Sequence, residues 1–294
     1  MMNSIQFFGA LELGLLYALV ALGVYLSFRT INFPDLTVDG SFTLGAAVCA
    51  ALMVDGMHPA LATFIAIAAG ALAGLVTGYL HVRWKILGLL AGIATMTALY
   101  SINLRIMGKP NIALLTETSL FSYFSGTHAS LMLLTIIILI TVVLLYLFLS
   151  SQFGLALRAT GINPKVSSAY GINVGKMTLV GLAMSNGLIA LGGALFAQCH
   201  GFADISLGTG TLIIGLASVI VGESVFHKQT ILSMLMSCIV GSVLYRIVIA
   251  IALNSQMIGL QASDLNLITA ILVVIAMLIP QLQQKIRSKT RRKS

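Results

Sequence analysis

The sequence predicts an all-α membrane protein, a single polytopic transmembrane bundle of about nine spans within residues 1–294. Hydrophobic residues make up 59% of the chain and charged residues 8%, whereas soluble domains carry about 25% charged residues. The mean hydropathy is +1.04. Long apolar runs recur along the chain, and Lys and Arg gather in alternate joints between them. These observations exclude a water-soluble fold.

Each predicted span is an apolar run close to the length of about 20 residues that crosses the hydrocarbon layer. The second run is short and the third and fourth are rich in Ala and Gly, so the count ranges from about eight to about ten. The first run lacks the positive start of a signal peptide and is expected to be retained. The predicted spans are 5–28, 38–54, 59–80, 86–107, 129–149, 177–200, 209–226, 230–253 and 265–282.

The distribution of Lys and Arg predicts that the N-terminus lies outside and the C-terminus inside. With the basic tail 283–294 inside, seven loop cations also fall inside, while Lys109 stays outside and Arg105 and Arg246 fall within spans. The seven are Arg29, Arg83, Lys85, Arg158, Lys165, Lys176 and Lys228. A basic tail is also found in nucleic-acid-binding arms, but beside a span it favours contact with anionic lipid headgroups. We therefore expect a membrane partner and no nucleic acid.

No sequence motif for catalysis is present. A Walker A motif, HExxH, GxSxG and a CxxC pair are all missing from the sequence. The five His residues are scattered over different joints and span ends. We therefore expect no metal, no cofactor and no enzyme activity in this chain, and any ATP would be bound by a partner subunit.

The longest predicted inner loop, 151–176, contains a short helix of its own. Asn163 is a suitable N-cap, Pro164 suits the first helical position, and Gly171 suits the residue after the helix. A helix of two turns is not stable alone in water. It must pack either on the ends of its own spans or on a second protein.

The pattern G-x-A-x-R-A-x-G-x-N-P-x-x-x-x-A-x-G-I at 154–172 resembles the coupling-helix loop of the branched-chain amino-acid and sugar permease family of ABC importers. The resemblance implies a permease subunit in a bacterial inner membrane, whose loop inserts into a separate cytoplasmic ATPase. It also implies an extracytoplasmic substrate-binding protein and a second permease copy, as a homodimer. The implied coupling residues are Arg158, Asn163, Pro164, Lys165, Ala169, Tyr170 and Gly171.

The segment 32–46 resembles the entrance to the second span in that family, but it carries Pro34, Asp35 and Asp39. These acids resemble a subgroup associated with tryptophan, tyrosine and related amino acids. The resemblance therefore implies transport of an amino acid, either branched-chain or aromatic.

Three polar residues inside the predicted spans need a partner, because burying charge in lipid is costly. Glu12 and Arg246 lie at similar depths, which predicts an intramembrane ion pair. Extension of Arg246 to the outer headgroups and contact with substrate are alternatives. Asn186 lies near the middle of its span, where it would bond a neighbouring helix or line a pathway.

The segments 33–45 and 202–215 resemble each other and predict an internal repeat. The charge pattern places Asp35 inside and Asp204 outside, as an inverted-topology repeat requires. Each segment stands immediately before a span, where its acid would cap the helix or line a pathway. The predicted pathway residues from the repeat are Asp35, Asp39, Thr43, Asp204 and Thr211.

An ion-coupled secondary transporter would share the apolar composition and the internal repeat. Such a protein is expected to carry an ionisable residue near the middle of a span. Glu12, the one acid well within a predicted span, lies off-centre. The sequence therefore favours the permease over the secondary transporter, and over a membrane-embedded enzyme with clustered His or Asp.

Overall fold

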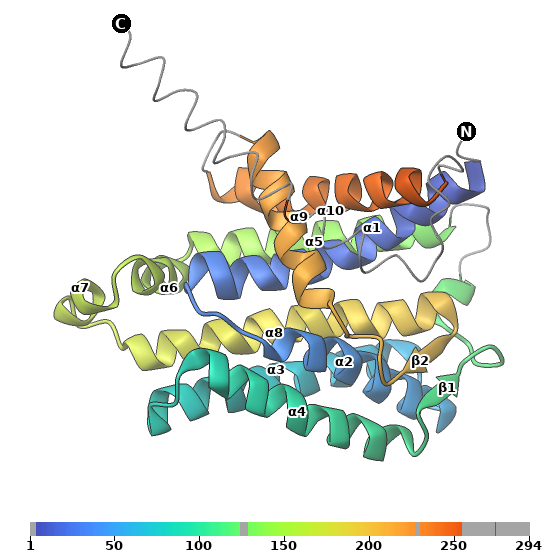
Figure 1. Cartoon of the computed structure of the whole chain (residues 1–294), viewed down its shortest axis with the longest axis horizontal. Coiled ribbons are helices and arrows are strands. Elements are labelled where there is room, and N and C mark those ends of the chain that lie inside the picture. The colour runs from blue at the N-terminus through green and yellow to red at the C-terminus, as the bar shows by residue number, and fades with distance from the viewer. Residues whose placement is uncertain (1–3, 124–128, 227–229, 255–273, 275–294) are drawn as a thin grey trace, which may run out of the picture.

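The computed structural model describes residues 4–123, 129–226, 230–254 and 274, and most of these residues are helical (Figure 1). The helices are α1 (Ser4–Val24), α2 (Thr37–Val54), α3 (Pro59–Trp84), α4 (Gly88–Met107), α5 (Ala129–Ser150), α6 (Gln152–Ile162), α7 (Pro164–Ala169), α8 (Val174–His200), α9 (Thr211–Val225) and α10 (Ile231–Asn254). The π-helix η1 (Tyr25–Thr30) continues α1, and the 3₁₀ helix η2 (Leu120–Tyr123) precedes α5. Strands β1 (Asn111–Ala113) and β2 (Phe202–Asp204) pair antiparallel.

Seven helices in the described part of the chain are long and apolar enough to cross a membrane. They correspond to the first six predicted spans and the eighth. The predicted seventh span is instead the 15-residue helix α9, which reaches only about 22 Å at 1.5 Å per residue. Residues 209 and 210, which the prediction placed in the span, belong to the loop before α9. The ninth prediction, 265–282, falls outside the described residues.

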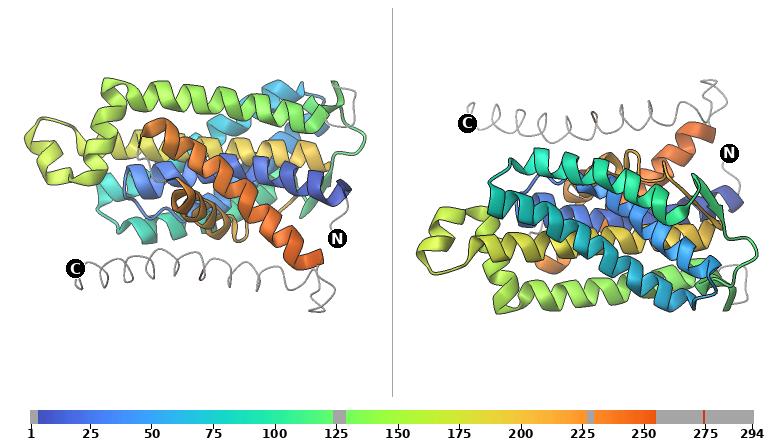
Figure 2. Two further views of the ribbon diagram at one scale, coloured as in Figure 1. Left: turned by 90° about the horizontal axis from the view of Figure 1, so that it is seen from above. Right: turned by 90° about the horizontal axis from the view of Figure 1, so that it is seen from below.

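The helices form an elongated bundle with a different feature at each end (Figures 1 and 2). Helices α6 and α7 project from one end, here called the α7 end, and the paired strands β1 and β2 lie at the other, the β end. Helices α1 and α8 occupy the centre: α2 and α3 pack on α8, and α9 and α10 pack on α1. Helix α9 crosses the long axis of the bundle (Figures 1 and 2).

Close packing of α2 on α8 depends on glycines, which let two backbones approach. A β-carbon on Gly193 would stand 2.0 Å from the carbonyl oxygen of Phe42, and one on Gly45 would stand 2.1 Å from that of Ala190. On the same helix α8, a β-carbon added to Gly187 would meet its nearest neighbour at 3.5 Å, an ordinary van der Waals distance. The contact between α2 and α8 therefore leaves no room for a methyl group.

We predict that Gly193→Ala destabilises the protein by about 1–3 kcal/mol, because the added methyl overpacks a rigid backbone contact. Gly187→Ala is the matched control, and it should be neutral or slightly stabilising because alanine favours the helix. Thermal denaturation of the two purified variants in detergent checks the difference. Equal melting temperatures would contradict the proposed packing of α2 on α8.

Candidate functional site

The start of α2 is held by a buried polar network that joins it to α8. The Asp35 carboxylate accepts hydrogen bonds from the Thr37 amide (2.9 Å) and from Nδ2 of Asn186 (2.7 Å). Oγ of Ser41 donates to Oδ1 of Asn186 at 2.7 Å. Asp35, Ser41 and Asn186 are fully buried. In this conformation neither Asp35 nor Asn186 is open to a passage, and both link helices.

The start of α9 is capped by a side chain from another helix. Gly210 stands at the N-cap position with φ +82° and offers no capping group. The carboxylate of Asp39 on α2 supplies the missing cap. It accepts from the Leu212 amide (2.8 Å), the Gly210 amide (3.1 Å) and the Thr211 hydroxyl (2.9 Å). These amides lack partners within the helix, and the helix dipole there favours a negative charge.

Thr43, one turn along α2 from Asp39, continues this contact. Its hydroxyl oxygen accepts a hydrogen bond of 2.9 Å from the amide of the buried Gly208. Thr43 and Thr211 are almost completely buried, at 4% and 1% exposure. The structure thus brings together the predicted residues Asp39, Thr43 and Thr211, which we call the α2/α9 junction. The Asp39 and Thr211 predictions come from opposite halves of the chain.

The two predicted repeat segments share one turn, but α2 begins two residues after Asp35, whereas α9 begins seven residues after Asp204. The prediction that Asp204 caps the helix that follows it was therefore wrong, and Asp39 caps α9 instead. The Asp35 carboxylate accepts from the amide two residues later, Thr37, and the Asp204 carboxylate accepts in the same way from Ser206 at 2.8 Å. Both are Asx-turns, in which the side chain replaces a backbone acceptor. Asp204 also accepts from Nδ2 of Asn111 at 3.2 Å.

Asp204 lies at the β end and stays charged more readily than an ordinary aspartate. Hydrogen bonds from the hydroxyl and amide of Ser206 hold the pKa of Asp204 below its usual value, with a smaller contribution from Asn111. Asp204 therefore keeps a negative charge at this end of the bundle over the whole physiological range of pH.

Glu12 and Arg246 do not form the predicted ion pair. The Arg246 guanidinium carbon lies 3.9 Å from the centroid of the Tyr17 ring, and Nε of Arg246 is buried without a hydrogen-bond partner. The Glu12 carboxylate accepts instead from Sγ of Cys199 at 2.8 Å. No salt bridge joins the two charges in the described residues. The prediction was wrong because each charge has a nearer partner, an aromatic face and a thiol.

Aromatic rings from three helices meet beside Arg246, in an arrangement that the sequence did not reveal. The ring centroids of Tyr17, Phe42 and Phe196 lie 5.7 to 6.5 Å apart. The His200 ring stacks on Phe196 at 4.1 Å, and Phe202 lies 6.2 Å from Phe196. We call these five residues the aromatic cluster. Phe42 is adjacent to Thr43, so the cluster adjoins the α2/α9 junction.

The α7 end carries the predicted coupling residues. Oδ1 of Asn163 accepts from the Val166 amide at 3.2 Å and caps α7, Pro164 is its first residue, and Gly171 follows with φ +81°. These local predictions are confirmed. Lys165, Ala169 and Tyr170 are exposed, whereas Nε of Arg158 on α6 is buried without a hydrogen-bond partner.

A groove of about 410 Å³ between α3, α5 and α8 is a separate feature. Its lining is apolar apart from Thr141, whose hydroxyl donates to the Ile137 carbonyl at 2.8 Å. A groove of this chemistry suits lipid acyl chains and offers nothing to a polar solute. It is therefore not a candidate for the functional site.

Comparison with known proteins decides the family. Residues 6–279 match the family model described as the branched-chain amino acid transport system permease component. The chain belongs to this permease family. It is therefore a multi-pass inner-membrane protein of the ABC importer permease type.

Several relatives of this permease carry names for different solutes. A tyrosine transport system permease protein of Clostridioides difficile is 44% identical, over 88% of this chain and 86% of that protein. A probable branched-chain amino acid transport permease of Methanocaldococcus jannaschii is 29% identical, over 70% and 69%. The ribose import permease of Escherichia coli K12 is 24% identical, over 91% and 83%.

Among solved structures, the permease resembles a chain of PsaBC from Streptococcus pneumoniae in complex with Fab. The TM-score is 0.55 and the identity 15%, and the match covers 97% of the permease and 94% of that chain. At this identity the likeness shows the fold alone.

We predict that Thr43→Val destabilises the permease by about 1–3 kcal/mol, because it leaves the buried Gly208 amide without an acceptor. Thr43→Ser keeps the hydroxyl and removes only a methyl group, so it is the matched control. Melting of both variants in detergent tests the prediction. If valine is tolerated as well as serine, the hydroxyl does not hold the junction.

Proposed function

We propose that this permease is the membrane subunit of an importer driven by a separate cytoplasmic ATPase, which binds the ATP and engages α6 and α7. The observation that carries the proposal is that the α7 end, which projects from the bundle (Figure 1), carries exposed apolar side chains. Ile162 is 86% exposed and Tyr170 82%, and Val166 lies between them at 48%. Large apolar side chains that project beyond the apolar spans require a protein partner to cover them.

The charges support placing the α7 end in the cytoplasm. Six cations of the described chain lie in or beside the joints predicted to face inside: Arg29, Arg83, Lys85, Arg158, Lys165 and Lys176. The β end carries Asp204, which the Ser206 hydrogen bonds keep charged. Positive loops favour the cytoplasmic side. On this orientation α6 and α7 face the ATPase, and the β end faces an extracytoplasmic substrate-binding protein.

The inverted repeat is supported by the packing as well as by the matching Asx-turns. Helices α2 and α3 pack on α8, which lies in the other repeat, and α9 and α10 pack on α1 in return. Gly45 of α2 meets the Ala190 backbone of α8, and the aligned Gly215 of α9 meets Val24 of α1. An inverted repeat is expected to show such equivalent contacts, in which the helices of each half pack on a central helix of the other half.

The pathway is proposed to pass beside the α2/α9 junction, between two copies of the permease. The centres of α1 and α8 are filled by buried side chains such as Leu19, Leu22 and Ile189, which leaves no passage through the middle of one copy. Helix α9 is too short to span the membrane, so its start lies at depth, where a pathway helix can meet the solute. A homodimer would supply two such starts.

An amino acid is the solute that the site fits best. Arg246 and Glu12 carry opposite charges, lie in spans and are not paired with each other. A zwitterion presents a carboxylate to the first and an ammonium to the second. The name of the relative with 44% identity agrees with this chemistry.

We predict that Ile162→Arg abolishes copurification of the cognate ATPase, because a charge on the contact surface must be desolvated when the partner docks. Leu115→Arg is the matched control: Leu115 is 85% exposed but lies toward the β end. Both variants should insert in the membrane normally. Equal recovery of the ATPase with both would contradict docking at α6 and α7.

We predict that Arg246→Gln raises the tyrosine concentration for half-maximal uptake by about tenfold, the value expected for one charge-assisted hydrogen bond. The exposed Arg105 on α4 gives the control, Arg105→Gln. Uptake into proteoliposomes with the ATPase and binding protein measures both. Unchanged uptake in the first variant would remove Arg246 from the solute site.

A further inference from the structure

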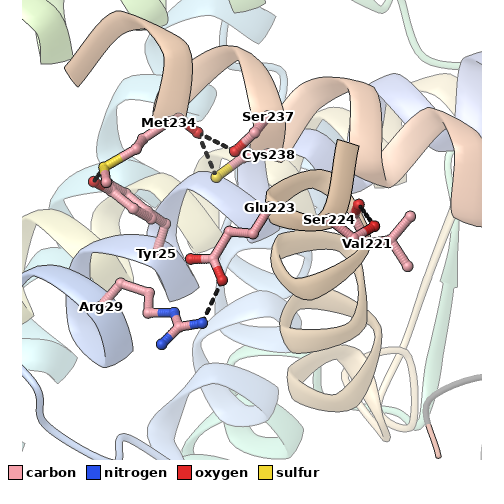
Figure 3. Close-up of polar contacts among 8 residues, drawn as sticks. All are labelled: Tyr25, Arg29, Val221, Glu223, Ser224, Met234, Ser237 and Cys238. Carbon is pink, nitrogen blue, oxygen red and sulfur yellow. Dashed lines mark hydrogen bonds and ion pairs between the residues drawn. The ribbon is translucent and has the colours of Figure 1, made fainter. Parts of the chain in front are cut away.

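One salt bridge joins two helices of the α7 half of the bundle. Arg29 of η1 donates to the carboxylate of Glu223 on α9 (Figure 3). The side chains are 53% and 32% exposed, and the described residues contain no other salt bridge. An exposed ion pair contributes little to stability. The interest of this ion pair therefore lies in which helices it joins, and not in its contribution to stability.

The ion pair lies at the end of α9 opposite the α2/α9 junction. Asp39 holds the first residues of α9 to α2, and Glu223 lies in the last turn of α9. Between them, Gly222 approaches the Ser237 carbonyl of α10 so closely that an added β-carbon would stand 1.9 Å from it. Helix α9 thus packs backbone to backbone on α10, and Arg29 links its last turn to η1 at the end of α1.

The same stretch of chain meets the coupling loop. A β-carbon on Gly161, at the end of α6, would stand 2.0 Å from the carbonyl oxygen of Thr30, the residue that follows Arg29. No side chain separates Gly161 from the backbone of Thr30, so α6 is in direct contact with the residue beside Arg29. A π-helical turn such as η1 often marks a functional site.

A second set of contacts keeps η1 on α10 without the ion pair. The Tyr25 hydroxyl donates to Sδ of Met234 at 3.0 Å (Figure 3). The Met234 carbonyl accepts from the Ser237 hydroxyl (2.7 Å) and Cys238 thiol (3.3 Å). Loss of the ion pair should therefore leave η1, α9 and α10 packed together, and remove only the direct polar link between η1 and the last turn of α9.

We propose that the Arg29–Glu223 ion pair is a breakable latch, which transmits movement of the coupling loop to α9 and restrains the last turn of α9 in this conformation. The inference rests on the proposed function, since it assigns the loop to an ATPase and α9 to the pathway. Both residues are positioning residues, and neither needs to touch the solute. Low strength suits a contact that breaks and forms in every transport cycle.

The test measures ATP hydrolysis by the permease assembled with its ATPase in proteoliposomes, without solute or binding protein. Arg29→Gln and Glu223→Gln should each raise this basal hydrolysis by about two- to fivefold, the range expected from loss of an exposed ion pair. The swap Arg29→Glu with Glu223→Arg should restore the basal rate. All three variants should copurify with the ATPase as the wild type does. A variant that is merely misfolded would lose the ATPase.

Arg83→Gln is the matched control, since Arg83 is exposed in the last turn of α3 and takes no part in a salt bridge of the described chain. Basal rates equal to the wild type in both single variants would overturn the latch, and so would a swap that behaves like the single variants. A wild-type permease that retains no ATPase would instead overturn the proposed function, and the latch with it.

Discussion

The bond between the Asp39 carboxylate and the start of α9 is the contact on which the rest of the structure depends. A helix that begins within a membrane exposes amides that neither water nor its own residues can satisfy. Gly210 and Leu212 carry such amides, and Asp39 accepts from both. The acid therefore satisfies the free amides at the start of a 15-residue helix, which the proposed function places within the membrane.

Placing α9 in this way determines its neighbours. Its start is joined to α2, its middle packs on α1 and α10, and its last turn reaches Arg29. Since α2 is itself joined to α8 through Asp35 and Asn186, the two halves of the chain are connected by buried polar bonds. Such bonds are costly to leave unmade in an apolar surrounding, so they define the register of the helices more sharply than apolar packing alone.

Helices and their caps, which depend on residues close in the sequence, could be predicted. Side-chain contacts between residues far apart in the sequence could not. Apolar length predicted most spans, and Asn163 and Pro164 predicted α7, because capping acts within four residues. The partners of Asp39 are more than 170 residues away, and only the repeat pointed to them. Tyr17, Phe42 and Phe196 look like ordinary span residues, so their cluster was missed. Opposite charge and similar depth in the spans paired Glu12 with Arg246 wrongly.

Hydrogen exchange at the start of α9 tests the central claim most directly. In the wild-type permease in nanodiscs, the amides of residues 208–212 should exchange as slowly as those in the middle of α8. In Asp39→Ala they should exchange much faster while α8 stays protected, and Asp55→Ala, at the exposed far end of α2, should change neither. Unchanged protection of 208–212 in Asp39→Ala would show that the carboxylate does not hold α9 in place.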